Sequence, residues 1–203
     1  MGSDQSVSGY AISSSGLFGC SPLSVTLSQG EATAIVVKAA RGFGLSWGLA
    51  EEAGWALCQL GRFMDDPLTL FATAFADTTD QCPITLGATL MDHAQIPKSI
   101  AQIGGDLGHV RMPILLIPFL QQAAASTRNC LQLCERNSGI RISICHHFEN
   151  QLSALQAVTS GNISITIENA DDVIKLPADL THRFTTSSNT LIQLDALCAR
   201  TYV

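Results

Sequence analysis

The chain has 203 residues, of which 46% are hydrophobic and 14% charged, and its formal net charge is −6 at pH 7. This length fits one domain, and the scattered basic residues argue against nucleic-acid binding, which needs a concentrated basic face. A lightly charged, apolar surface is typical of subunit contacts, so we expect a homo-oligomer.

Seven cysteines form an odd number, and the N-terminal stretch "MGSDQSVSGYAISSSGLFGCSP" has neither a basic start nor a sustained apolar run. These features predict reduced thiols and a cytoplasmic protein. No apolar run approaches the roughly 18 residues that cross a bilayer, so we expect a soluble protein with no membrane partner.

Residues 1–22 are rich in Ser and Gly, which predicts a disordered or loosely packed tail before a single domain over residues 23–203. Helical structure is expected from Ser28, because Ser28 and Glu31 form a capping box. The glycines at 42 and 44 are suited to ending this first helix. Its apolar residues repeat at helical spacing: Ala32, Ile35, Val36, Ala39 and Phe43.

A second helix, capped by Ser46, is predicted from Trp47 to about Phe63. Residues 67–76 fit either a short helix with Pro67 at its first position or a strand.

Residues 82–97 are expected to form a strand with a loop behind it, and residues 104–112 a glycine-rich loop. Residues 113–117, "PILLI", have the apolar density of a buried strand. A helix should then run from Pro118 to about Thr127.

Alternating apolar residues predict a β-hairpin over residues 130–144, with its turn at 137–139, and a third strand over residues 162–168. Such a sheet is wet on one face and covered on the other, and the N-terminal helix pair is the obvious cover. A last helix is expected over residues 189–200. The predicted fold is therefore α+β: an N-terminal helical hairpin packed on a mostly antiparallel sheet, with a C-terminal helix.

The stretch "KAARGFGLSWGLAEEAG", residues 38–54, has two interpretations. Free N–H groups at the start of the second helix, with Arg41 and Ser46, could hold a carboxylate or phosphate. Alternatively, the stretch is a packed corner, with Gly54 and Gly61 allowing another helix to approach closely. A dinucleotide loop is rejected because a helix, not a strand, precedes the glycines.

A second candidate site lies in "GGDLGHVRM", residues 104–112. Asp106 could orient His109 as a general base, and Arg111 could bind a carboxylate. The alternative is an ordinary glycine turn.

Cysteine and histidine side chains gather near the predicted hairpin, at Cys130, Cys134, Cys145 and His147. A C-x₃-C pair on a strand spans roughly 13 Å, too far for one zinc ion. We therefore predict no metal site, and no motif assigns a cofactor or a reaction.

Two segments resemble an uncharacterised bacterial family, a domain of unknown function found in soluble proteins of about this size. They are the helix pair around "KAARGFGLSWGLAEEAG" and the C-terminal "LDALCARTYV", with "CPITLGATL" and "MPILLIPF" similar more weakly. The resemblance implies a single bacterial cytoplasmic domain and brings no reaction or catalytic residue.

Two hypotheses follow. In the first, the protein binds or acts on a small anionic metabolite through Arg41, the start of the second helix, His109 and Arg111. In the second, it is a non-catalytic, homo-oligomeric accessory or interaction protein, whose apolar surface and "WGLAEEAG" helix make subunit contacts.

Overall fold

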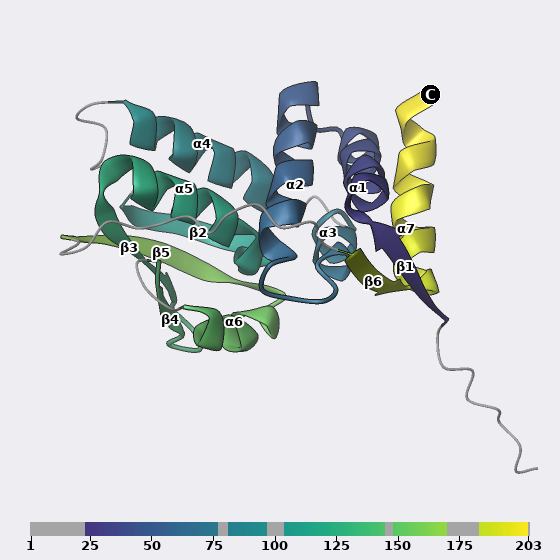
Figure 1. Ribbon diagram of the computed structural model, residues 1–203. Coiled ribbons are helices and arrows are strands. Elements are labelled where there is room, and N and C mark those ends of the chain that lie inside the picture. Colours follow the sequence, from purple (N-terminus) through teal and green to yellow (C-terminus); the bar gives the residue numbers. More distant parts are fainter. Residues whose placement is uncertain (1–22, 77–80, 97–103, 145–147, 170–182, 203) are drawn as a thin grey trace, which may run out of the picture.

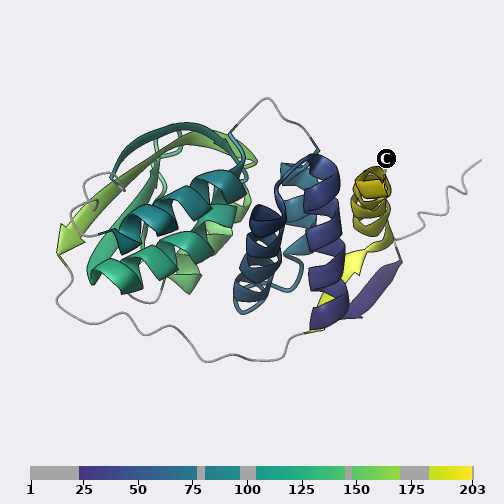
Figure 2. The ribbon, with the colours of Figure 1, turned by 90° about the horizontal axis from the view of Figure 1, so that it is seen from above.

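A computed structural model describes residues 23–76, 81–96, 104–144, 148–169 and 183–202. The predicted tail, residues 1–22, lies outside these ranges. Figures 1 and 2 show the chain in two parts that lie side by side: a group of upright helices with a small sheet, and a larger sheet crossed by two helices.

The first part joins the two ends of the described chain. Helix α1 packs against both α2 and α7, and strand β1 pairs antiparallel with β6. Its elements are β1 (Ser24–Ser28), α1 (Gln29–Phe43), α2 (Trp47–Leu60), α3 (Leu68–Ala74), β6 (Arg183–Ser187), α7 (Ser188–Cys198) and the 3₁₀ turn η3 (Ala199–Tyr202).

The predicted capping box at the start of α1 is confirmed. Ser28 Oγ accepts from the Glu31 backbone N–H at 3.3 Å, and the Glu31 carboxylate accepts from the Ser28 N–H at 2.9 Å. These bonds satisfy two backbone donors that the helix itself leaves unpaired.

The corner between α1 and α2 also forms as predicted. Gly44 ends α1 with φ 108°, a left-handed conformation that glycine adopts without steric cost. Ser46 then caps α2, its Oγ accepting from the Leu49 N–H at 3.4 Å.

The two helices of the hairpin approach closely at Gly54. A Cβ added there would lie 2.8 Å from Val37 Cγ2 and 2.9 Å from Thr33 Cγ2. The glycine therefore lets α1 pack directly on the α2 backbone, which is the packed-corner interpretation of residues 38–54.

The second part is a four-stranded antiparallel sheet in the order β2-β5-β3-β4. Helices α4 and α5 lie side by side over one face of this sheet (Figure 2). Its elements are α4 (Pro83–Gln95), β2 (Gly105–Arg111), the 3₁₀ turn η2 (Pro113–Leu116), α5 (Ile117–Thr127), β3 (Asn129–Glu135), β4 (Arg141–Ser143), α6 (Glu149–Gln156) and β5 (Ser160–Asn169).

The strand register puts the apolar side chains on one face. Leu133 pairs with Ile142 on one side and Ile165 on the other, and all three are buried. Asn162 and Thr166, which point the opposite way from Ile165, are exposed. The predicted hairpin and third strand are thus observed.

The α+β fold class, the N-terminal hairpin and the C-terminal helix are confirmed. The cover of the larger sheet differs from expectation: α5 packs on β3, while α2 contacts α4 and α5. Helix α1 packs instead on the small β1–β6 sheet.

Residues 82–97 were expected as a strand, and this is wrong, because Pro83 begins α4. Its buried residues follow a helical repeat: Pro83, Ile84, Gly87, Ala88, Leu90 and Ala94. Small residues on the buried face let the Phe119 ring of α5 lie against Gly87.

Residues 104–112 were expected as a loop, and this is wrong, because residues 105–111 form β2. Gly105 and Gly108 have positive φ values of 125° and 74°, and the pairing register shifts between Asp106 and Gly108. The glycines thus shape a bulge in an edge strand rather than a turn.

The apolar run "PILLI" is the 3₁₀ turn η2 leading into α5, not a strand. Periodicity cannot separate a buried strand from a buried helical segment when every residue is apolar. The predicted helix from Pro118 is observed as α5, and residues 68–74 take the helical alternative as α3.

The prediction of reduced thiols is wrong for Cys130, which is disulfide-bonded. Four other cysteines are free: Cys58, Cys82, Cys134 and Cys198. Among the described helices, none has the length and apolar character needed to cross a bilayer.

Candidate functional site

Arg41, a predicted anion ligand, holds the helix corner. Its Nη1 donates to the Leu45 carbonyl, and its guanidinium carbon lies 5.0 Å from the centroid of the Trp47 ring. Ser46, the other predicted ligand there, accepts the Leu49 N–H as a helix cap. Both side chains therefore have structural partners at the corner.

The Asp106 carboxylate already has two partners within the protein. Its Oδ1 accepts from the Gly108 N–H at 2.9 Å, and its Oδ2 lies 2.8 Å from Arg136 Nη1. His109 is exposed on β2, opposite Asn162 of β5.

Arg111 connects β2 to the helical part, since its Nη1 donates to the Thr73 carbonyl of α3 at 3.4 Å. Helix α3 also contacts α1. There the rings of Phe75 and Phe43 stack, with their centroids 5.0 Å apart. The structure thus places the predicted residues in two sets, one at the α1–α2 corner and one on β2, with α3 between them.

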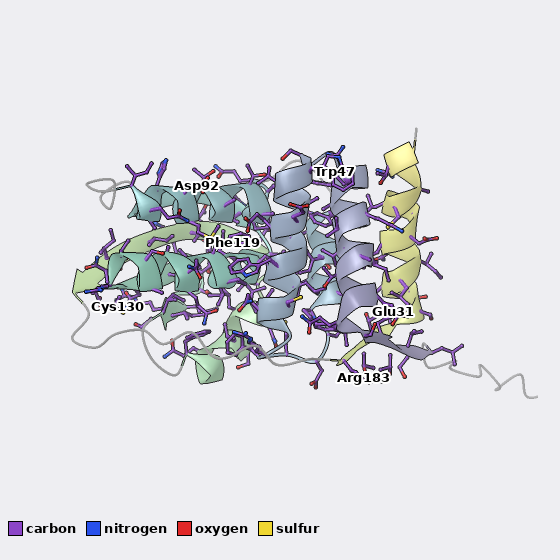
Figure 3. The ribbon with its side chains drawn as sticks, turned by 45° about the horizontal axis from the view of Figure 1, so that its top comes forward. Glu31, Trp47, Asp92, Phe119, Cys130 and Arg183 are labelled. Carbon is purple, nitrogen blue, oxygen red and sulfur yellow. The ribbon has the colours of Figure 1, made fainter. Side chains whose placement is uncertain are left out.

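A groove runs along the α1–α2 hairpin, and we call it the hairpin groove. Its volume is about 780 Å³. Trp47, at the corner end of the hairpin in Figure 3, keeps 64% of its surface exposed. The groove is lined by Gln29, Gly30, Thr33, Ala34, Val37, Lys38, Trp47, Glu51 and Cys58.

Two polar side chains of α1 contact the sulfur of Cys58 in the hairpin groove. Gln29 Nε2 donates to Cys58 Sγ at 3.4 Å, and Thr33 Oγ1 lies 3.3 Å from the same sulfur. These contacts use polar groups within the groove, so what it offers to a partner is mainly apolar surface and the two charges of Lys38 and Glu51.

A second groove, of about 390 Å³, lies between α2, α4 and α5. Burial raises the pKa of Glu52 above its ordinary value, and the negative charges of Asp92 and Glu51 raise it further. The groove is lined by Glu51, Glu52, Trp55, Met91, Gln95 and Gln122. Its charge disfavours an anionic ligand.

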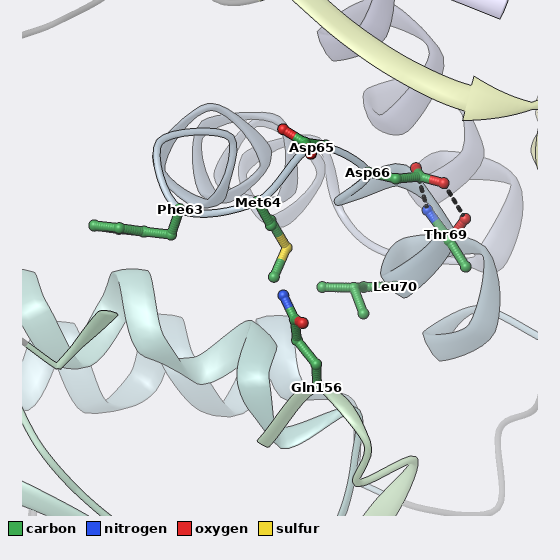
Figure 4. Close-up of a pocket in the computed structure, with 7 residues that line it drawn as sticks. All are labelled: Phe63, Met64, Asp65, Asp66, Thr69, Leu70 and Gln156. Carbon is green, nitrogen blue, oxygen red and sulfur yellow. Dashed lines mark hydrogen bonds between the residues drawn. The ribbon is translucent and has the colours of Figure 1, made fainter. Parts of the chain in front are cut away.

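The third groove, of about 480 Å³, lies beside the α2–α3 connection (Figure 4). Its carboxylate Asp66 accepts from the Thr69 N–H at 3.2 Å and from Thr69 Oγ1 at 2.7 Å, which caps α3. The hydroxyls of Thr69 and Thr190 are 2.9 Å apart and join α3 to α7. The groove is lined by Phe63, Met64, Asp65, Asp66, Thr69, Leu70 and Gln156.

Within the described ranges, no three His, Cys, Asp or Glu side chains lie close enough together to hold a metal ion. Cys145 and His147 of the predicted cluster fall outside those ranges.

The sequence drew attention to the glycines of the corner and missed the hairpin groove beside them. Gly30 and Ala34 lie one turn apart on the α1 wall of the hairpin groove. Neither belongs to the apolar repeat from which α1 was predicted, so that repeat gave no sign of the groove. The second hypothesis did assign subunit contacts to the "WGLAEEAG" helix, which begins at Trp47.

The protein is therefore an α+β protein with a mainly apolar groove on its N-terminal helical hairpin. Residues 27–86 match the family model described as Protein of unknown function (DUF3726). This confirms the resemblance to a domain of unknown function, and the whole hairpin groove lies within the matched segment. No curated protein and no solved structure matches the chain.

Proposed function

We propose that this chain is a non-catalytic interaction protein that binds a protein partner in the hairpin groove. The observation that carries the proposal is the groove itself: a mainly apolar surface beside a tryptophan that is 64% exposed. Exposed apolar surface rimmed by polar residues is typical of protein interaction sites, and tryptophan is common among the residues that dominate binding energy.

The hypothesis of a small anionic ligand has less support. At the corner, Arg41 already donates to the Leu45 carbonyl and packs on Trp47, and an anion near Asp106 would meet a carboxylate that is paired with Arg136. A thermal-shift screen with phosphates and carboxylates separates the two proposals. A ligand at a hundred times its dissociation constant would stabilise the protein by about 2.7 kcal/mol, whereas the interaction proposal expects no shift.

Site-specific photo-crosslinking in the producing cell tests the interaction proposal directly. A benzophenone amino acid replaces Ala34 in the groove or, as a matched control, Ala196, an exposed alanine on α7. We expect a discrete protein adduct from position 34 and none from position 196. Equal labelling from both positions, or no adduct from position 34, would overturn the proposal.

A further inference from the structure

We infer that the occupant of the hairpin groove is a second copy of this chain, related to the first by a two-fold axis between Lys38 and Glu51. This inference rests on the proposed function and names its partner. Three features of the hairpin support it: the register of α1 against α2, the charges of Lys38 and Glu51, and the position of Trp47.

The register of the hairpin is set by two contacts. Gly54 of α2 lies level with Thr33 and Val37 of α1, and Cys58 lies level with Gln29 and Thr33. Position 54 is thus level with the middle of the segment 33–37, and the antiparallel helices keep this relation along their length.

The same register puts Lys38 and Glu51 opposite each other across the groove. Glu51 is three residues before Gly54, and Lys38 is three residues beyond the middle of 33–37, so each lies about 4.5 Å nearer the corner. Both side chains are exposed and line the groove. A two-fold axis between them sets Lys38 of each copy over Glu51 of the other, giving two reciprocal ion pairs.

The same two-fold axis brings the exposed Trp47 indole into contact with the other copy. Trp47 precedes Glu51 by four residues and lies about 6 Å nearer the corner, while Ala34 precedes Lys38 by four residues and lies about 6 Å farther from it. The rotation therefore carries Trp47 of one copy onto α1 of the other at the level of Ala34. Gly30, one turn further, has no atom within 4 Å of its Cβ position, so this end of the groove is open.

The arrangement is self-complementary, as the contact of a two-fold dimer must be. Each copy supplies one tryptophan, one small-residue wall, one lysine and one glutamate. Burying the Trp47 ring in each half supplies the apolar stabilisation, because a tryptophan side chain buries roughly 200 Å².

Sedimentation velocity of the purified full chain over a hundredfold concentration range tests the inference. We expect dimers that dissociate on dilution. Ala34→Arg should weaken the dimer at least tenfold, because the new side chain occupies the space that Trp47 of the other copy would fill. Ala196→Arg makes the same change at an exposed position of α7 and should leave the dimer unchanged. Circular dichroism establishes that both variants fold.

Charge reversal gives the sharper test. Lys38→Glu and Glu51→Lys should each weaken self-association, since each homodimer would hold two like-charged pairs. A one-to-one mixture of the two variants should recover a heterodimer, in which both pairs are again opposite in sign. A change within one chain cannot produce this recovery.

The inference is overturned if the chain stays monomeric throughout, if Ala34→Arg leaves the dimer intact, or if the mixed variants do not associate. A monomeric chain that still gives a crosslink from position 34 to a different protein would refute the second copy as occupant and leave the interaction proposal standing.

Discussion

Gly42 of α1 faces the backbone of Leu197 in α7 so closely that an added Cβ would lie 1.8 Å from the Leu197 carbonyl oxygen. This contact lets the C-terminal helix pack on the N-terminal one, and it involves main-chain atoms that cannot rotate away. Gly42→Ala should therefore push the two helices apart and lower the free energy of unfolding by about 3 kcal/mol, measured by urea denaturation.

Gly30→Ala is the matched control for Gly42→Ala, because it makes the same change in the same helix where nothing lies within 4 Å of the new methyl group. It should stabilise the protein by up to about 1 kcal/mol through helix propensity. Equal effects of the two changes would contradict the close contact between α1 and α7.

Glu135 should make stability depend on acid pH. Burial alone would raise its pKa, yet hydrogen bonds from Ser138 and Asn137 outweigh burial and hold the pKa below its ordinary value. A lowered pKa contributes stability that is present above the ordinary glutamate pKa and lost as pH falls through the folded value. Glu135→Gln should cost about 1 kcal/mol at pH 7 and progressively less in acid.

Urea denaturation at a series of pH values measures this effect. Glu168→Gln, at an exposed position of the neighbouring strand β5, is the control and should follow the wild type. A constant difference between Glu135→Gln and wild type at every pH would show that the carboxylate charge is not what the turn binds.

Glu52 should make stability depend on pH in the opposite sense to Glu135. Burial raises its pKa, and the charges of Asp92 and Glu51 raise it further. The folded protein then holds a proton longer than the unfolded chain does, so its stability falls as pH rises from the ordinary glutamate pKa through the raised one. Glu52→Gln should remove this loss and raise the thermal midpoint at pH 7, with no gain at acid pH. A lower midpoint at neutral pH would instead show that the charge of Glu52 is stabilising.

Local signals predicted the hairpin well because its ends depend on neighbouring residues. Ser28 with Glu31, Gly44 and Ser46 each act within one helical turn, so a short sequence window contains the whole interaction. The strand alternation around Leu133 and Ile165 was readable for the same reason.

What the sequence missed depends on partners far along the chain. Strand β1 has its pairing partner β6 about 160 residues away, so their pairing cannot be predicted from either segment alone. The bulge at Gly108 forms because β2 pairs with β5, and without that partner its glycines resemble a loop. The hairpin groove is likewise a property of two packed helices rather than of either sequence segment.

Arg41 provides the test between a packed corner and an anion site. Its guanidinium donates to the Leu45 carbonyl and stacks on Trp47, so Arg41→Ala should lower the free energy of unfolding by about 1–2 kcal/mol without any ligand present. The fluorescence of Trp47 should change as well, because the cation over its ring is lost.

Arg200→Ala, at an exposed position of η3, is the control and should change neither stability nor emission. If Arg41→Ala proved as stable as the parent with unchanged emission, the side chain would have no packing role, and its charge would again be a candidate for binding an anion. A destabilised Arg41→Ala protein instead assigns the guanidinium to the corner that holds Trp47 in place beside the hairpin groove.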